Sequence, residues 1–438
     1  MASTTTANRT TAAPRLTVTH GLTVAQGAAL SIGAVLGTGV IALPALAAQT
    51  AGPASLLAWI VLIALSVPLA ATFAALGARY PDSGGVSTYV RSAFGSRLAA
   101  VVGWCFYFAV PAGAPAAAMF GGAYVAAALG GGLRTTLLTA AGLMAIVTLT
   151  NAGGLRISGR VQLALAALLV TLLLAATLTA LPHARLENLQ PFAPHGWLAI
   201  GPAAAVLVWG FAGWEAVTSL AADFRRPARD LPRATGIALA VVGLLYLGVA
   251  TASVLVLGSA TGSTEAPLAE LLAIGVGGEV RVLTAFAALL LTLGAMNAYY
   301  AGAAKLGAAL GRDGALPAWF ARGSRAGVVP RRSLAVVSGL GVLALVIVAV
   351  TGVGARPLVL LTTGSFVLVY VLGMAAAVRL LPRGSWSRRA AMVALAAVVA
   401  LLFVTGVYVL WALFIALAAL IYERRRKQAP VVETEYQG

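Results

Sequence analysis

Long apolar blocks separated by short polar segments dominate the chain. The blocks at 56–78, 161–181 and 236–257 each extend over more than 20 residues. A helix that crosses the hydrocarbon core of a bilayer needs about 20 predominantly apolar residues, so the pattern predicts many membrane-spanning helices. We predict twelve of them, at residues 24–49, 54–78, 96–129, 134–152, 158–181, 197–222, 234–258, 280–306, 333–353, 357–380, 389–404 and 406–422.

The composition agrees with an integral membrane protein. Hydrophobic residues make up 61% of the chain and charged residues 9%, whereas soluble globular proteins have roughly 45–50% and about 25%. The single cysteine, Cys105, lies inside an apolar block, and the histidines His20, His183 and His195 lie outside the predicted spans. These positions exclude a disulfide framework and a thiolate metal site. We therefore expect no cofactor and no intramembrane metallohydrolase.

The net charge of +17 could indicate nucleic acid as a partner, but the positions of the charges argue against it. With the N-terminus in the cytoplasm, the predicted external loops carry only four of the 29 Lys and Arg residues: Arg134, Arg185, Arg281 and Arg356. Such asymmetry is the positive-inside rule of membrane proteins. Basic cytoplasmic loops face anionic lipid headgroups, so lipids are the expected partners and nucleic acid is unnecessary.

The C-terminal part of the topology has two possible interpretations. Residues 388–422 form either two short helices that turn near Thr405 and Gly406 or one long tilted helix. Two helices keep the basic run that starts at Arg424 in the cytoplasm, as the charge rule requires. We therefore favour twelve helices, a disordered cytoplasmic tail at 1–20 and a cytoplasmic tail at 423–438.

Two of the predicted helices are interrupted near their middles. The stretch 33–44 contains three glycines and a proline, and the stretch 208–215 contains two glycines and a glutamate. The two helices are five apart and so run in opposite directions, as equivalent members of two inverted five-helix repeats would. Paired glycine interruptions of this kind point to a transporter's substrate site. The alternative is close helix packing, because Gly33-x-x-x-Gly37 is also a packing motif.

Three motifs carry a resemblance to a known family. They are Leu36-Gly37-Thr38-Gly39-Val40 with Pro44, the segment 80–86, and the segment 209–215 followed by 223–234. In this order and at these spacings they resemble the amino acid-polyamine-organocation (APC) transporters, over nearly the whole chain. Residues 22–104 are most similar to the bacterial L-methionine and branched-chain amino acid exporters.

The resemblance implies an all-α, LeuT-like fold with alternating access. Ten helices would form two inverted repeats, at 21–182 and 183–382, and 383–422 would add two peripheral helices. It also implies a multi-pass protein of the bacterial inner membrane with both termini in the cytoplasm. An amino acid exporter is the first expectation, and an importer or exchanger of the same fold is the alternative. A membrane enzyme or a sensor fits least, since the spans hold no acid pair and no histidine.

The interrupted helices suit a zwitterionic ligand. The amides of Gly39 and Val40, at the start of an outer half-helix, would favour a carboxylate. Carbonyls near Gly33 and Gly210 can accept hydrogen bonds from an ammonium group. A neutral, largely apolar amino acid follows, its side chain selected by Trp209 and Phe211, unless Trp209 only packs. The predicted binding residues are Gly33, Gly37, Thr38, Gly39, Val40, Trp209, Gly210, Phe211 and Gly213.

Glu215 is the only acidic residue that the prediction places in the membrane, and such a carboxyl group is a functional hypothesis by default. Removal from water disfavours the anion more than the dipole of the following half-helix favours it. We therefore expect Glu215 to be protonated when the site is occluded and to ionise when water enters, as proton coupling requires. The alternative is a permanently neutral acid that bonds a backbone carbonyl.

Overall fold

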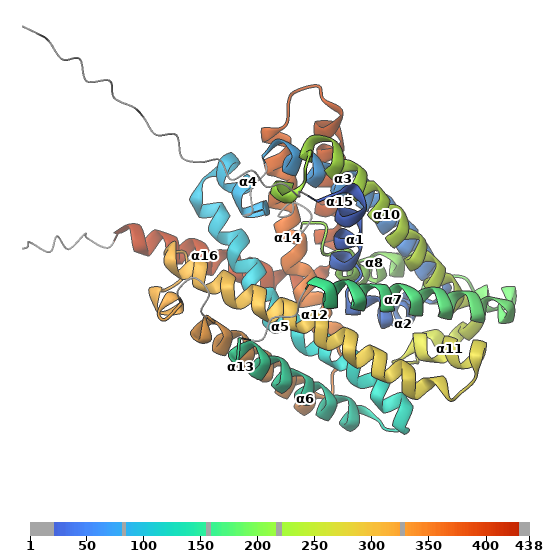
Figure 1. Cartoon of the computed structure of the whole chain (residues 1–438). Helices are drawn as coiled ribbons and strands as arrows, with labels where there is room; N and C mark the ends of the chain where they lie inside the picture. The colour runs from blue at the N-terminus through green and yellow to red at the C-terminus, as the bar shows by residue number, and fades with distance from the viewer. Residues whose placement is uncertain (1–21, 81–84, 155–158, 216–220, 325–328, 429–438) are drawn as a thin grey trace, which may run out of the picture.

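The computed structural model describes residues 22–80, 85–154, 159–215, 221–324 and 329–428 (Figure 1). These residues are almost entirely helical, and their one extended pairing is an isolated bridge between Leu22 and Phe224. The α-helices are α1 (Val24–Val35), α2 (Leu43–Ala51), α3 (Ser55–Arg79), α4 (Gly85–Phe94), α5 (Ser96–Leu129), α6 (Leu133–Ala152), α7 (Gly159–Ala180), α8 (Ile200–Phe211), α10 (Pro227–Ala252), α11 (Pro267–Val276), α12 (Val280–Arg312), α13 (Arg331–Thr351), α14 (Arg356–Leu380), α15 (Trp386–Val404) and α16 (Val409–Gln428).

Ten helical stretches among the described residues are long and apolar enough to cross a membrane. They correspond to all the predicted spans except 24–49 and 197–222, the two that we expected to be interrupted. The first of these is present as the short helices α1 and α2, and the second as α8. Residues 216–220 of the second lie outside the described residues. The all-helical membrane fold is thus confirmed.

Helix α5 is the central element of the bundle. It has 34 residues, and at about 1.5 Å per residue it is longer than a bilayer core of about 30 Å. It packs against α6, α12, α13, α14 and α16 (Figure 1). Its buried positions are mostly alanine and glycine, which allow helices to approach closely inside a membrane.

The chain ends in two helices rather than one. Helix α15 ends at Val404 and α16 begins at Val409, with a 3-10 turn at Gly406–Tyr408 between them. Gly406 has φ of +66°, a left-handed conformation that glycine adopts without strain. Helix α16 continues to Gln428, so residues 423–428 of the predicted C-terminal tail are helical. The predicted tail at 1–20 and residues 429–438 lie outside the described residues.

Two short helices were not predicted. Helix α4 has buried Val86, Tyr89 and Val90 along one face and exposed Arg91 on another, so it lies along the surface rather than across the membrane. Helix α11 occupies the segment between α10 and α12 and packs against α7 and α12. Each has 10 residues, too few to produce the long apolar block on which the prediction depended.

The segment before α1 is joined to the segment that follows the sixth predicted helix. The Leu22 N–H donates to the Asp223 carbonyl over 2.8 Å, and the Arg225 N–H donates to the Leu22 carbonyl over 3.4 Å. The ring of Phe224 lies against Gly27 of α1, where any side chain on Gly27 would collide with it.

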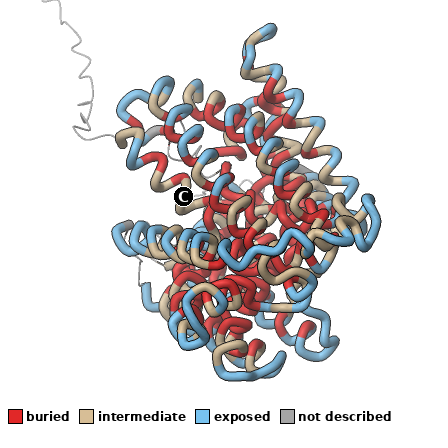
Figure 2. The backbone as a smooth tube through the Cα atoms, turned by 90° about the vertical axis from the view of Figure 1, so that its right-hand side faces the viewer, coloured by how far each residue is buried: buried red, intermediate tan, exposed pale blue. Residues whose placement is uncertain are grey.

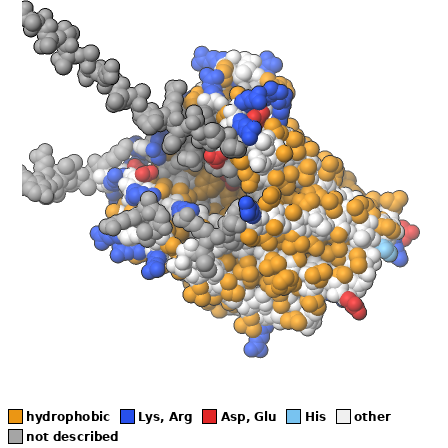
Figure 3. All heavy atoms as spheres, viewed as in Figure 1, with side chains coloured by type: hydrophobic (Ala, Val, Ile, Leu, Met, Phe, Trp, Pro, Cys, Tyr) orange, Lys and Arg blue, Asp and Glu red, His pale blue; other side chains and the backbone are white. Residues whose placement is uncertain are grey.

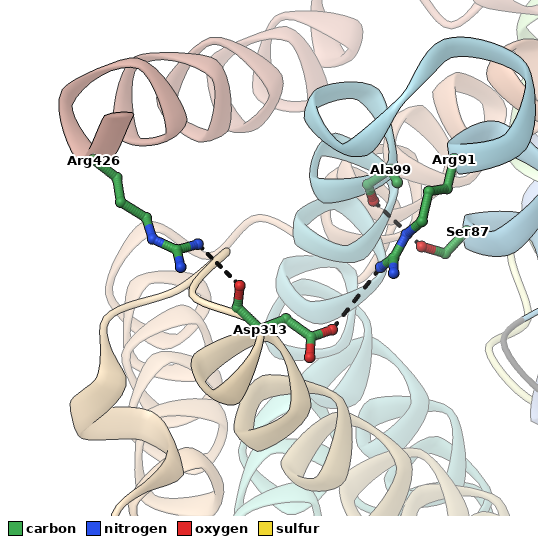
Figure 4. A network of polar contacts seen from close by, with 5 residues as sticks. All are labelled: Ser87, Arg91, Ala99, Asp313 and Arg426. Carbon is green, nitrogen blue, oxygen red and sulfur yellow. Dashed lines mark hydrogen bonds and ion pairs between the residues drawn. The ribbon is translucent and has the colours of Figure 1, made fainter. Parts of the chain in front are cut away.

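Asp313 connects three helices at one end of the molecule (Figure 4). Its carboxylate lies 3.9 Å from the guanidinium of Arg91 in α4, and its carbonyl accepts a 2.9 Å hydrogen bond from Arg426 in α16. Both partners of the ion pair are about 60% exposed, so it contributes little to stability. The network shows that the end of α12 lies between α4 and α16.

The surface separates into an apolar belt and a basic end. Figure 2 shows buried residues inside the bundle and exposed ones around it. In Figure 3 hydrophobic side chains cover the middle of the visible face, whereas most of the visible Lys and Arg side chains gather in two groups, one near α4 and the end of α16 and one at the top around the connection between α14 and α15. This distribution fits a membrane-embedded belt and a basic cytoplasmic end.

Candidate functional site

The first break lies between α1 and α2. Helix α1 ends at Val35, Leu36 leaves the helical region with ψ of 72°, and Gly37 is extended. A 3-10 turn, Thr38–Ile41, then leads into α2, whose first turn contains Pro44. The first N–H groups of a helical segment have no partner within it. The break therefore presents amides at the start of the outer segment.

The second break follows α8. Helix α8 ends at Phe211, Ala212 is extended, and Gly213 has φ of +130°. A Cβ atom on Gly213 would lie only 2.7 Å from the carbonyl oxygen of Ala34 and 3.1 Å from Cα of Val35. Glycine is therefore required here both for the backbone conformation and for the contact. The two breaks touch directly, backbone against backbone.

Tyr246 of α10 bridges the two breaks. Its hydroxyl lies 3.1 Å from the carbonyl oxygen of Val35 and 2.7 Å from that of Gly210. We expected unpaired carbonyls at both breaks, but these two already have a donor within reach. The Val35 carbonyl also accepts a 2.7 Å hydrogen bond from the Gly37 N–H. A carbonyl oxygen has two lone pairs, so the Gly210 carbonyl keeps one for a second hydrogen bond even when Tyr246 donates to it.

A narrow cavity of about 50 Å³ lies at the two breaks, and we refer to it as the central cavity. Its wall is mainly apolar, and the polar side-chain groups of its lining residues are the indole N–H of Trp209 and the hydroxyl groups of Tyr299 and Thr362. The indole ring of Trp209 lies against Gly39, where a Cβ atom would collide with it, and against Gly113. The lining residues are Val35, Gly37, Gly39, Ala109, Val110, Gly113, Ala114, Ala117, Trp209, Gly210, Ala212, Met296, Tyr299, Thr362 and Phe366.

A second space, the inner cavity, lies between α1, α7 and α12 and has a volume of about 410 Å³. It shares Gly37 and Tyr299 with the central cavity and is also lined by Gly33, Gly213 and Glu215. By the predicted topology it lies toward the cytoplasm, beside the second half of α1 and the first half of α7.

A third space, the outer cavity, lies on the opposite side. Phe120 lines the outer cavity and Trp209 lines the central one. Their ring centroids are 6.1 Å apart in an edge-to-face arrangement. These two rings separate the outer cavity from the central cavity.

Glu215 lies at the end of the second break. Its Oε2 atom accepts a 2.9 Å hydrogen bond from the Gly213 N–H and a hydrogen bond from the hydroxyl of Tyr370 in α14. The alternative prediction for Glu215 is a neutral acid that bonds a backbone carbonyl. Neither of these two bonds is of that kind, because the Gly213 N–H and the Tyr370 hydroxyl are both donors. Our prediction has the inner half-helix begin at Glu215, and the residues that follow it, 216–220, lie outside the described part of the chain.

The predicted site residues divide into three groups. Gly37, Gly39, Trp209 and Gly210 line the central cavity. Gly33, Gly213 and Glu215 line the inner cavity, as does Gly37. In the described part of the chain, the side chains of Val40 and Phe211 line neither, and the side chain of Thr38 is not among those described.

Phe211 differs from the prediction for a geometric reason. We placed it with Trp209 in the site, but α8 continues as a helix through both residues. Residues two apart in a helix point about 200° away from each other. The ring of Phe211 therefore packs on Trp59 and Tyr246 instead.

Sequence reasoning missed Gly113, Tyr246, Thr362 and Tyr370. The glycine had a local signal, since it lies between Pro111 and Pro115 in the middle of a span. The other three are polar side chains in otherwise apolar helices. Such side chains are expected to form hydrogen bonds when buried, but the sequence does not identify their partners.

Comparisons with known proteins agree with this architecture. The sequence profile of the family described as amino acid permease matches residues 22–430. The chain is 32% identical over 361 residues to the uncharacterized amino acid permease YecA of Bacillus subtilis, covering 82% of this chain and 85% of that protein.

Two further relatives match over about half of their lengths. The L-methionine/branched-chain amino acid exporter YjeH of Escherichia coli is 41% identical over 209 residues, which cover 47% of this chain and 50% of that protein. The branched-chain amino acid permease BcaP of Bacillus subtilis is 28% identical over 221 residues, which cover 46% and 47%.

Proposed function

Because this chain belongs to the amino acid permease family and is an amino acid transporter rather than an enzyme, we propose that it exports neutral, largely apolar amino acids by alternating access. The single observation that carries this proposal is the central cavity at the two touching breaks. Among the described residues that line it, none is charged.

The substrate's charged groups would bind to the backbone. The carboxylate would accept hydrogen bonds from the amides at the start of the Thr38–Ile41 turn. The ammonium group would donate to the free lone pair of the Gly210 carbonyl, which Tyr246 holds in place. A substrate with a charged side chain would have to bury that charge without a partner, which is costly. A substrate of net charge zero is therefore favoured.

The substrate's side chain would lie against apolar residues. Val110, Ala114, Met296 and Phe366 surround the central cavity together with Trp209. These surfaces suit methionine and the branched-chain amino acids. The partial similarity to an L-methionine/branched-chain amino acid exporter supports the same substrates and the outward direction.

The two breaks also support the proposed architecture. In a LeuT-like fold the helices that contain α1 and α8 would be equivalent members of two inverted repeats, at 21–182 and 183–382. Helices α15 and α16 would be the two peripheral helices, for twelve spans in all. The basic end near α4 and α16 would face the cytoplasm of a bacterium, and both termini would lie on that side.

Glu215 would couple transport to protons. It lines the inner cavity, so water that enters from the cytoplasm could reach its carboxyl group and exchange a proton there. Tyr370 and the Gly213 amide hold one oxygen of this group in place. Proton movement would thereby be linked to the opening of the inner side.

Counterflow in proteoliposomes tests the proposal. Vesicles loaded with each of the twenty amino acids should accumulate labelled methionine or leucine when loaded with apolar neutral substrates and not when loaded with lysine or glutamate. A pH gradient should then drive net movement. Equal counterflow with charged and apolar amino acids would contradict the proposed specificity.

The second candidate is an importer or exchanger with the same site, which the similarity to a branched-chain amino acid permease supports. Cells that overproduce the protein distinguish the two. An exporter should lower the intracellular methionine concentration, and an importer should raise it.

A further inference from the structure

The outer cavity is a substantial space outside the Phe120–Trp209 pair. Its volume is about 430 Å³, and it lies between α2, α5, the start of α6, the segment Gly262–Glu265 and the start of α14. Its floor includes Met119 and Phe120. By the predicted topology it opens to the external side.

Two opposite charges line this cavity. Glu265 lies on one of its segments and Arg356 on another. Within the described residues neither belongs to an ion pair, whereas nearby Glu270 and Arg281 are paired at 3.0 Å. The Nε atom of Arg356 is buried without a hydrogen-bond partner. That atom is itself too enclosed to meet a ligand, but the half-buried guanidinium carries its charge with no acidic partner among the described residues, so an anion in the cavity would stabilise it.

The backbone near Arg356 reinforces its charge. Arg356 is the first residue of α14, a helix of 25 residues. Residues 353–357 all line the cavity, so the positive end of the helix dipole lies beside it. One side of the cavity therefore favours an anion, and Glu265 provides a site for a cation on the other.

We propose that the outer cavity is a second binding site for zwitterionic α-amino acids, with Arg356 on the carboxylate and Glu265 on the ammonium group. The proposal rests on the amino acid substrate proposed above. Unlike the central cavity, which would bind these two groups through its backbone, the outer one would bind them through charged side chains. It therefore accepts a wider range of side chains than the central cavity, from which the Phe120–Trp209 pair divides it.

Thiol labelling tests the site without requiring transport. Ser263 lines the outer cavity and is exposed, and the single native cysteine, Cys105, is buried. In Ser263→Cys, an impermeant maleimide should label the new thiol, and external methionine or alanine should slow the labelling at least about threefold. An amine or a carboxylic acid alone should protect far less, since each satisfies only one of the two charges.

Two second-site variants decide where the protecting amino acid binds. Protection should disappear in Ser263→Cys/Arg356→Gln and persist in Ser263→Cys/Arg185→Gln, whose altered arginine lies on another external segment. Protection should also persist in Ser263→Cys/Gly39→Val, which blocks the central cavity. Protection that is lost with Gly39→Val but unaffected by Arg356→Gln would overturn the proposal, because it would place the ligand in the central cavity alone.

Transport kinetics give an independent measurement. In right-side-out vesicles, Arg356→Gln and Glu265→Gln should each raise the half-saturating external concentration about tenfold, as expected for losing one hydrogen bond to a charged group. The half-saturating internal concentration should not change. Equal changes on both sides would contradict an outer site. A parent protein that moves no amino acid would contradict the proposed function instead, and the labelling experiment would still report binding.

Discussion

The two breaks are made with glycine for different reasons. At the first break, Gly37 is extended, and a Cβ atom on it would meet nothing closer than 4.0 Å. The absence of a side chain there leaves free space where the central and inner cavities meet. At the second, Gly213 has positive φ and presses on the backbone of Ala34, so glycine is required by the fold. The same residue type thus serves ligand access in one break and backbone packing in the other, and substitutions should separate the two roles.

The largest effect is expected for Gly213→Val. The backbone conformation costs a non-glycine residue about 1–3 kcal/mol, and the collision with the Ala34 carbonyl adds about 1–3 kcal/mol. Neither cost can be relieved by rotating a side chain. The yield of folded protein and its melting temperature in detergent should fall sharply. Gly302→Ala, at a position with open space around it, is the control and should be neutral.

Gly39→Val should abolish substrate binding while the protein still folds. The added side chain collides with the indole of Trp209, a side chain that can move, and it enters the space where the carboxylate should bind. Size-exclusion profiles should match the parent while binding of labelled methionine is lost. Unchanged binding would exclude the first break as the substrate site.

Glu215→Gln should separate binding from coupling at the second break. Glutamine cannot release a proton, so movement driven by a pH gradient should be lost, whereas exchange without a gradient should be retained. Both fluxes are measured in the same liposomes at several pH values. Tyr370→Phe, which keeps the acid and removes one donor, is the matched comparison. Undiminished gradient-driven flux in Glu215→Gln would rule out the coupling role.

Trp209→Ala should change the selectivity among substrates. Trp209 precedes the second break, but its indole ring forms a wall of the central cavity and lies against Gly39 of the first break. The loss of a large apolar contact should weaken binding of methionine or leucine by about tenfold or more, which corresponds to about 1.4 kcal/mol. Binding of alanine should change far less. A uniform loss for all three substrates would assign Trp209 to packing.

The smallest effect is expected for Tyr246→Phe, which removes the hydroxyl shared by the two breaks. The single hydrogen that the hydroxyl donates is lost; the Val35 carbonyl keeps the Gly37 N–H, but the Gly210 carbonyl loses its donor, at about 1–3 kcal/mol for an unsatisfied group. The ring remains packed on Trp59 and Phe211. The melting temperature should fall by a few degrees, and substrate affinity should fall with it. Phe211→Leu, which disturbs the same packing without touching the carbonyls, should leave affinity closer to that of the parent.

The sequence predicted the parts of this molecule that depend on local pattern. Helix length and hydropathy located the spans, and the glycines at 37 and 213 located both breaks. The helices α4 and α11 escaped because they are short and lie outside the apolar blocks. The tyrosine hydrogen-bond donors to Glu215 and to the Val35 carbonyl could not be predicted for another reason. Tyr370 and Tyr246 reach them from 155 and 211 residues away in the chain, and nothing in the local pattern specifies such contacts.

The attachment of Leu22 to the segment 223–225 has a mechanical consequence. Helix α1 is connected to the sixth-helix region at two levels, by this backbone pairing at one end and by the Gly213 contact with Ala34 at the other. Because α1 is attached near both of its ends, its two halves cannot tilt independently of each other. In the proposed alternating-access cycle, a tilt of α1 would therefore carry the neighbouring segment with it, and the inner cavity would open in a single movement.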